Sequence, residues 1–149
     1  MPRILVADDH AAMRRRVRDI LESQEGWEVC AEAATGREAV ALTAAKRPDI
    51  VVLDLSMPEL DGLQAARQIH EQFPETVMII LTGHDPLELI AALPAFGVRT
   101  YLSKADLYQL IEAIGSIWQQ IRNSSNAPSN TVGKIAADAQ QPRPSLGVQ

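Results

Sequence analysis

The sequence predicts an α/β fold in which a five-stranded parallel sheet carries helices on both faces. Short β-rich apolar runs alternate with segments of helical period along residues 1–123, which is the pattern of βαβ units. The chain has 149 residues, of which 46% are hydrophobic, enough to bury one substantial core. No uninterrupted apolar run is longer than five residues, so we expect no membrane span.

Each expected strand is a short run of aliphatic and β-branched residues. The five runs are Ile4 to Val6, Trp27 to Cys30, Ile50 to Leu53, Val77 to Leu81 and Thr100 to Leu102. A helical segment follows each run, so crossover connections between parallel strands are expected throughout.

The first and last of five expected helices are marked by apolar stripes. The first stripe comprises Met13, Val17, Ile20 and Leu21, and the last comprises Leu107, Leu110, Ile111, Ile114, Trp118 and Ile121. Both stripes have the spacing of core-facing helix surfaces, and neither requires a bound cofactor.

Capping residues predict where the other helices begin. Thr35 and Glu38 have the spacing of a capping box before the second helix. Asp61 and Asp106 are candidate N-caps of the third and fifth helices, because a short carboxylate can accept a hydrogen bond from a first-turn N–H.

The fourth helix is expected to be short, from Pro86 to Leu93. Asp85 suits the N-cap, Pro86 the first turn and Glu88 the third position. Pro94 has no backbone N–H to donate and should end or kink this helix early.

The segment from Ser124 to Gln149 is expected to be a disordered tail after a domain of residues 1–123. It has no aromatic residue and is rich in Ser, Asn, Gln and Pro, a composition that cannot build its own core. The N-terminus does not look like a signal peptide. A single cysteine, Cys30, cannot form an internal disulfide, and both observations favour a cytoplasmic location.

The charge balance argues against a general nucleic-acid binder. The net charge is −5, and because Lys134, Arg143 and Asp138 give the tail +1, residues 1–123 carry −6. One basic cluster is interpreted as a solvated helix face, with docking of an acidic partner as the alternative. This cluster comprises Arg14, Arg15, Arg16 and Arg18.

Polar side chains stand at the carboxyl ends of four expected strands. Asp8 and Asp9 follow the first strand, Asp54 ends the third, Thr82 ends the fourth and Lys104 follows the fifth. In an open sheet of flavodoxin-like order 2-1-3-4-5, ligands bind at this edge, in the crevice between strands 1 and 3. We therefore expect the three aspartates to converge.

Three converging carboxylates repel one another unless a cation lies among them. Oxygen ligands with room for water suit Mg²⁺. The histidines His10, His70 and His84 show no metal-ligand spacing with one another or with Cys30, so zinc is disfavoured.

A carboxylate beside Mg²⁺, an ammonium and a hydroxyl suits an aspartyl phosphate. Asp54 would be the nucleophile, with Mg²⁺ and Lys104 neutralising charge on the transferring group. Thr82 would lie on the same rim, and the small Gly83 beside it would leave space for the phosphoryl group.

Four segments, "LVADDH", "VVLDLSMPELDGL", "IILTGH" and "YLSKA", resemble the receiver domains of two-component response regulators. The resemblance runs from about Arg3 to Asn123. It implies that Asp54 is the phosphoacceptor and that Mg²⁺ is held by Asp8, Asp9, Asp54 and the backbone carbonyl of Ser56.

The same resemblance implies roles for three further residues. Thr82 would bind a phosphoryl oxygen and Lys104 would pair with the phosphoryl group. Tyr101 would be a switch aromatic that turns inward when Thr82 is drawn to the phosphate. Its alternative interpretation is a half-buried strand aromatic.

Residues that flank the mouth of the site have less defined roles. His10 is interpreted as a polar residue that opens the first helix, with tuning of docking or proton balance as the alternative. By the family resemblance, His84 and Ser56 stand at positions that modulate how fast phosphate is lost.

The residues of these motifs resemble the branch of the family whose receivers precede a LuxR-type helix-turn-helix. In this chain the tail occupies the place of the linker to that domain.

Two departures from the family pattern concern a loop at the site and the expected output face. Ala105 replaces a proline that often follows the lysine through a cis peptide, so the geometry of this loop is open. Pro94 falls in the expected output face, made by the fourth helix, fifth strand and fifth helix.

Three functions follow as hypotheses. The first is a phosphorylation-switched receiver that is not a conventional enzyme, accepts phosphate from a histidine kinase or phosphotransfer protein, and then binds a protein partner or a second copy. The second is a phosphatase with an aspartate nucleophile, which would need a general acid where Ser56 stands. The third is a remnant of a DNA-binding regulator, for which no helix-turn-helix segment is visible.

Overall fold

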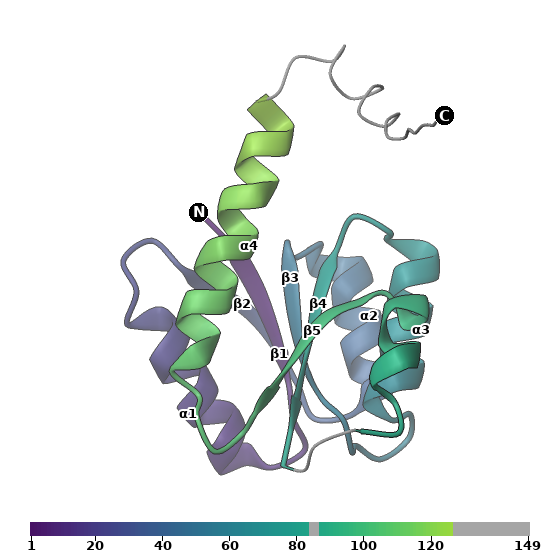
Figure 1. Ribbon diagram of the computed structural model, residues 1–149. Coiled ribbons are helices and arrows are strands. Elements are labelled where there is room, and N and C mark those ends of the chain that lie inside the picture. Colours follow the sequence, from purple (N-terminus) through teal and green to yellow (C-terminus); the bar gives the residue numbers. More distant parts are fainter. Residues whose placement is uncertain (84–86, 127–149) are drawn as a thin grey trace, which may run out of the picture. The chain divides into compact units, whose positions relative to one another are not determined.

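A parallel β-sheet with the strand order β2-β1-β3-β4-β5 forms the centre of the fold (Figure 1). The computed structural model describes residues 1–83 and 87–126, and this part of the chain holds five strands. They are β1 (Arg3–Ala7), β2 (Glu28–Ala33), β3 (Ile50–Asp54), β4 (Val77–Thr82) and β5 (Val98–Ser103). All neighbouring strands pair in parallel, so the predicted class and strand order are confirmed.

The three inner strands form the buried part of the sheet. Every residue of β3 is buried, and so are β1 from Ile4 and β4 from Met78 onward. This burial on both faces explains the continuous aliphatic runs in these strands, because parallel sheets are covered by helices on both sides.

The described residues contain four α-helices and one 3₁₀ helix. These are α1 (Ala11–Glu22), α2 (Gly36–Lys46), α3 (Gly62–Gln72), η1 (Ile90–Phe96) and α4 (Gln109–Asn126). Helix α1 covers one face of the sheet, and α2 and α3 lie side by side on the other (Figure 1). No helix within these residues is long and apolar enough to cross a membrane.

The chain divides into two compact units, Met1–Ile114 and Gly115–Gln149. The first unit contains the whole sheet and the residues of the candidate site. The domain boundary predicted at residue 123 stays a prediction, and the tail from residue 127 onward lies outside the described residues.

The prediction for the fourth helix is wrong in type and position. An α-helix from Pro86 to Leu93 was expected, whereas a 3₁₀ helix runs from Ile90 to Phe96 with Pro94 inside it. Proline fixes φ near −65°, which suits a 3₁₀ turn, and in so short a segment its missing N–H interrupts little. Glu88 precedes the helix, and the expected cap residues Asp85 and Pro86 lie outside the described residues.

The predicted caps of α2 and α3 are confirmed. The Thr35 hydroxyl accepts a hydrogen bond from Glu38 N at 3.0 Å, and the Glu38 carboxylate in turn accepts one from Ala34 N at 2.7 Å. Asp61 Oδ1 accepts from Gln64 N at 2.9 Å. Asp106, the other candidate N-cap, does not directly precede α4, because this helix begins at Gln109.

The predicted apolar stripes supply core residues. Val17, Ile20 and Leu21 of α1 are buried, while Met13 is half-buried. In the last stripe, the buried positions of the first unit are Leu107, Leu110 and Ile114.

Candidate functional site

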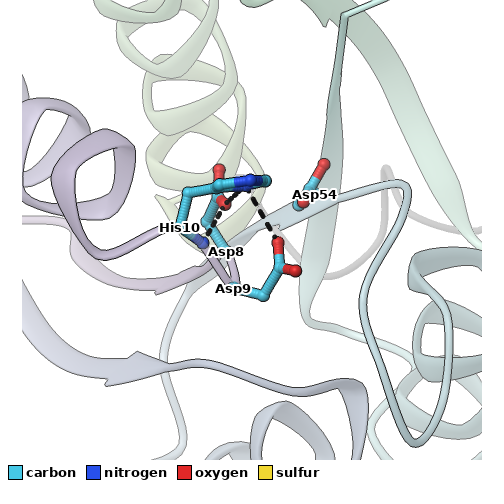
Figure 2. Close-up of side chains that lie close together, drawn as sticks. All are labelled: Asp8, Asp9, His10 and Asp54. Carbon is cyan, nitrogen blue, oxygen red and sulfur yellow. Dashed lines mark hydrogen bonds and ion pairs between the residues drawn. The ribbon is translucent and has the colours of Figure 1, made fainter.

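The carboxyl ends of four strands meet at one edge of the sheet and bring the predicted polar residues together. Asp8 and Asp9 follow β1, Asp54 ends β3, Thr82 ends β4 and Lys104 follows β5. The register aligns these ends, because Ala7 pairs with Leu53, Asp54 with Leu81 and Thr82 with Ser103. The expected convergence of the three aspartates is therefore what the structure has (Figure 2).

Lys104 joins two of the carboxylates. Its Nζ lies 2.9 Å from Asp54 Oδ1 and 3.1 Å from Asp8 Oδ2. Asp8 and Asp54 are only 2% and 5% exposed, so this ammonium is the counter-charge for two buried anions. Thr82 is also buried at the end of the neighbouring strand, and its carbonyl accepts a hydrogen bond from Lys104 N at 2.9 Å.

Burial dominates the electrostatics of Asp54. Desolvation raises the pKa of its carboxyl and the charge of Asp8 raises it further, while the hydrogen bond from Lys104 and the N–H of Ser56 lower it. The balance is a raised pKa, because removal from water penalises the charged form. The carboxylate is therefore held in a site where additional positive charge would be stabilising.

The pKa of Lys104 is raised even though burial alone would lower it. Desolvation lowers the pKa of its ammonium, but hydrogen bonds and charges from Asp54 and Asp8 outweigh that effect, so its pKa is raised. The lysine therefore stays protonated at neutral pH and acts as a fixed positive charge.

Backbone contacts fix Asp8 in place. Its Oδ1 accepts a hydrogen bond from His10 N at 2.8 Å, its carbonyl accepts one from Arg14 Nη1 at 2.7 Å, and its N–H donates to Ala33 O at 2.9 Å. The remaining oxygen, Oδ2, is buried and forms an ion pair with Lys104 Nζ at 3.1 Å.

The residues present fit a divalent cation. Asp8, Asp9, His10 and Asp54 each offer one ligand atom, and these atoms lie within 4.8 Å of one another. The three carboxylates outnumber the single ammonium of Lys104, which pairs with Asp8 and Asp54. Hard oxygen donors with excess negative charge are the donor set that Mg²⁺ prefers.

The loop after Asp54 is held tightly against α3. Leu55 N donates to Leu81 O at 3.2 Å, and Gly62 N donates to Leu55 O at 2.9 Å. A Cβ at Gly62 would lie 2.2 Å from the Asp54 carbonyl oxygen, so only glycine allows this approach. Ser56 is exposed on this loop, and its role as a carbonyl ligand stays a prediction.

The residues around Lys104 form a hydrogen-bonded turn. Ala105 N donates to Ser103 Oγ at 3.0 Å, and Asp106 N donates to Ser103 O at 3.2 Å. Tyr101 is half-buried on β5 and packs against the hydrophobic core. Its position fits the half-buried strand aromatic of the alternative interpretation, and its switch role stays a prediction.

Two features of the site were missed by the sequence interpretation. The arginine cluster is only partly a solvated face, because Arg14 and Arg18 contact Glu32 of β2 at 3.1 and 2.9 Å. The His10 side chain makes no capping hydrogen bond within residues 1–83 and 87–126, and its Nδ1 lies 3.2 Å from Asp9 Oδ1 (Figure 2). A histidine directly after an acidic pair was the available signal for the second feature.

Solved structures and curated proteins resemble this chain. A LuxR-family two-component response regulator from Aurantimonas superposes with a TM-score of 0.75 at 34% identity, over 78% of this chain and 84% of that one. The oxygen regulatory protein NreC of Staphylococcus epidermidis is 42% identical over 119 residues, which are 78% of this chain and 55% of NreC. A protein-glutamate methylesterase/protein-glutamine glutaminase of Alkalilimnicola ehrlichii is 40% identical over 68% of this chain and 26% of its own.

The chain spans about half the length of the first curated relatives that it matches. The matched part is nearly the whole of the compact first unit, since the model of the response regulator receiver domain family matches residues 4–115. These similarities favour a receiver over the phosphatase that the sequence also suggested. The chain belongs to the response regulator receiver domains, the phosphorylation-dependent signalling modules of two-component systems.

Proposed function

We propose that Asp54 accepts a phosphoryl group from a histidine kinase or a phosphotransfer protein, with Mg²⁺ as cofactor. The observation that carries this proposal is the placement of a buried carboxylate 2.9 Å from the Lys104 ammonium and beside two further aspartates. Such a pocket combines a nucleophile with positive charge for a transferring anion.

In the proposed transfer, an oxygen of Asp54 attacks phosphorus while the bond between phosphorus and the donor imidazole nitrogen breaks. The electron pair of that bond stays on the nitrogen, and because the other ring nitrogen of the donor carries a proton, the products are an acyl phosphate and a neutral imidazole. Lys104 lies 2.9 Å from Asp54 Oδ1, where its ammonium would offset negative charge on the transferring phosphoryl oxygens. Mg²⁺, held by Asp8, Asp9, Asp54 and the Ser56 carbonyl, would offset the charge of the phosphoryl oxygens.

We propose that Thr82 and Tyr101 carry the response to phosphorylation. Tyr101 pairs with Ile80 across β4 and β5, and Thr82 is two residues after Ile80, so the side chains of Thr82 and Tyr101 share one face of the sheet. A pull on Thr82 by the phosphoryl group would open space that a half-buried Tyr101 can enter. Such a coupled move would bias a two-state surface.

The proposed output surface is formed by η1, β5 and the first turn of α4, and its partner is a downstream protein or a second copy of the chain. Strand β5 is an edge of the sheet, so a change in Tyr101 lies close to this surface. The chain would act in the cytoplasm, without direct binding of nucleic acid and without a conventional enzymatic activity. Phosphatase chemistry has less support, because the residue two after Asp54 is an exposed serine.

The proposed function is tested by incubating the full chain with acetyl phosphate and Mg²⁺ and measuring intact mass. We expect the mass of one added phosphoryl group, lost on treatment with hydroxylamine, which cleaves acyl phosphates. Asp54→Asn should abolish the addition, while the exposed control Asp19→Asn should keep it. Phosphorylation that survives Asp54→Asn would refute Asp54 as the acceptor.

A further inference from the structure

Arg14 reaches from helix α1 to the main chain of the acidic pocket. Its Nη1 donates a hydrogen bond to the Asp8 carbonyl oxygen at 2.7 Å, and its Nε donates one to Glu32 Oε1 of β2 at 3.1 Å. The side chain of Arg14 is 21% exposed and that of Glu32 is 30% exposed, so both contacts are partly shielded from water. The proposed phosphoryl transfer gives this guanidinium no task.

A second arginine holds the same glutamate. Arg18 Nη1 lies 2.9 Å from Glu32 Oε2, while Arg14 binds Oε1. Arg14 and Arg18 are four residues apart and lie on one face of α1, where like charges repel each other. Glu32 offsets this repulsion with one oxygen for each guanidinium. Because both of its oxygens are bonded, the glutamate restricts the direction in which the Arg14 side chain extends.

Two adjacent residues of β2 hold both ends of the Asp8 main chain. The Asp8 N–H donates to the Ala33 carbonyl oxygen at 2.9 Å. The Asp8 carbonyl accepts from Arg14, which is itself bound to Glu32. Glu32 and Ala33 pair with the last two residues of β1. Strand β2 therefore fixes the Asp8 main chain directly on one side and through Arg14 on the other.

The carbonyl that Arg14 holds belongs to the peptide unit between the two adjacent acidic residues. This unit is planar and includes the Cα atoms of both Asp8 and Asp9. A hydrogen bond that fixes its oxygen therefore restricts the directions in which both side chains leave the main chain. The two carboxylates are potential ligands of one cation together with Asp54. Because Mg²⁺ demands a nearly octahedral arrangement of ligands, their orientation should affect its affinity.

We infer that Arg14 is a positioning residue of the cation site. Held by Glu32, it fixes the peptide unit between Asp8 and Asp9 and so sets the orientation of their carboxylates. This inference rests on the proposed function, because it concerns the cation of that site. The direction of the effect separates positioning from charge. Removal of a positive charge near an acidic pocket would by itself strengthen cation binding, whereas loss of a positioning contact should weaken it.

The first test is isothermal titration calorimetry of the full chain with Mg²⁺ and without a phosphoryl donor. Arg14→Met should lower the Mg²⁺ affinity about 10-fold. Arg16→Met is the matched control, because Arg16 is an exposed residue of the same helix and its replacement removes the same charge. This control should leave the affinity unchanged or raise it. Circular dichroism checks that both variants are folded.

Two variants of Glu32 test the geometry at constant charge. Glu32→Gln and Glu32→Ala remove the same negative charge, but only the amide oxygen of glutamine can still accept a hydrogen bond from Arg14. We therefore expect Glu32→Gln to bind Mg²⁺ more tightly than Glu32→Ala. If Arg14→Met does not fold, this pair of variants decides the inference.

The Mg²⁺ dependence of phosphorylation separates positioning from a general loss of structure. With acetyl phosphate at a fixed concentration, Arg14→Met should need about 10-fold more Mg²⁺ to reach half of its maximal rate. Its rate at saturating Mg²⁺ should stay close to that of the wild type, because Asp54 and Lys104 are unchanged. A general loss of structure would lower the maximal rate instead.

Two results would overturn the inference. One is an unchanged or higher Mg²⁺ affinity in a folded Arg14→Met protein, and the other is an equal affinity of the two Glu32 variants. Phosphorylation of wild-type Asp54 in Mg²⁺ is measured in the same series, and it would show that the proposed function stands even if Arg14 positions nothing. Absence of that phosphorylation would contradict the proposed function, whereas the calorimetric test requires no phosphoryl transfer.

Discussion

At the scale of single residues, the Lys104 ammonium stabilises two buried carboxylates that lie in one pocket. Its Nζ contacts both Asp8 and Asp54, at 3.1 and 2.9 Å. Both carboxylates are also potential ligands of a divalent cation, so the ammonium and a metal ion would compete for negative charge. Without either cation, two adjacent buried anions would repel each other.

Replacing Lys104 with methionine should therefore separate metal binding from phosphorylation. We expect tighter Mg²⁺ binding, because a competing positive charge is gone, and slower phosphorylation, because the ammonium that would offset the charge of the transferring phosphoryl oxygens is gone. Calorimetry and the rate of acetyl phosphate transfer measure the two effects. The exposed control Lys46→Met should change neither, and an unchanged Mg²⁺ affinity in Lys104→Met would show that the two cations do not compete.

The raised pKa of Asp54 makes a prediction about stability and pH. When the pKa of a carboxyl is higher in the folded state than in the unfolded state, the free energy of unfolding falls as pH rises. The fall begins near the unfolded pKa, about 3.9, and is complete above the folded value. Asp54→Asn cannot ionise and should therefore be more stable than the wild type at pH 7 without Mg²⁺. Urea unfolding should show this gain, and the gain should shrink as pH falls towards 4.

Lys104 has the opposite linkage. Its pKa is raised in the folded state, so its stabilising contribution is present below the unfolded pKa, about 10.4, and is lost as pH rises through the folded value. Wild-type protein should therefore lose more stability than Lys104→Met on going from pH 9 to above pH 11. Parallel urea titrations of the two proteins measure this difference, and equal losses would contradict the assigned ion pairs.

At the scale of elements, two glycines let the site loop lie between helices. A Cβ at Gly36, the first residue of α2, would lie 1.8 Å from the Leu60 carbonyl oxygen, and one at Gly62 would lie 2.2 Å from that of Asp54. Both obstacles are main-chain atoms, which cannot move aside as a side-chain end can. The loop from Leu55 to Asp61 is therefore positioned by the starts of α2 and α3.

Gly62→Ala should damage both stability and phosphorylation. The added methyl group must displace the Asp54 backbone, and overpacking of this kind costs about 1 to 3 kcal/mol. Urea unfolding and acetyl phosphate labelling measure the two consequences. Gly83→Ala is the matched control for stability at the same edge of the sheet, since a Cβ at Gly83 would meet nothing within 4 Å among the described residues. A fully active and stable Gly62→Ala protein would contradict the close approach.

The elements differ in how well the sequence predicts them. Thr35 and Asp61 were predicted as caps because a cap depends on neighbours within three residues. The segment around Pro94 was predicted wrongly, because a proline that breaks an α-helix is tolerated in a short 3₁₀ helix, and sequence alone does not choose between them. The strands were found to within a few residues because buried aliphatic runs are a strong signal.

The candidate site was predictable for the same reason that the sheet was. Once strand order is known, residues at the carboxyl ends of β1 and β3 must meet. The direction of the His10 imidazole and the reach of Arg14 to the Asp8 carbonyl were not predictable, because rotamers in a strand-to-helix loop depend on the three-dimensional contacts around them.

At the scale of the whole molecule, the remaining question is how phosphorylation is communicated. We expect beryllofluoride, a mimic of the phosphoryl group, to raise the melting temperature in Mg²⁺ by binding the folded state. Light scattering should then show a doubled mass if the output is self-association, and Asp54→Ala should abolish the change. An unchanged mass with a raised melting temperature would direct the search to a different protein partner.

The close approach of Gly62 to the Asp54 carbonyl restricts movement on one side of the pocket. The main chain at Asp54 cannot move towards α3, because no space lies between them. A Cβ at Gly83, the residue after Thr82, would meet nothing within 4 Å among the described residues. A change at Asp54 therefore has less room to move the chain towards α3 than at the end of β4.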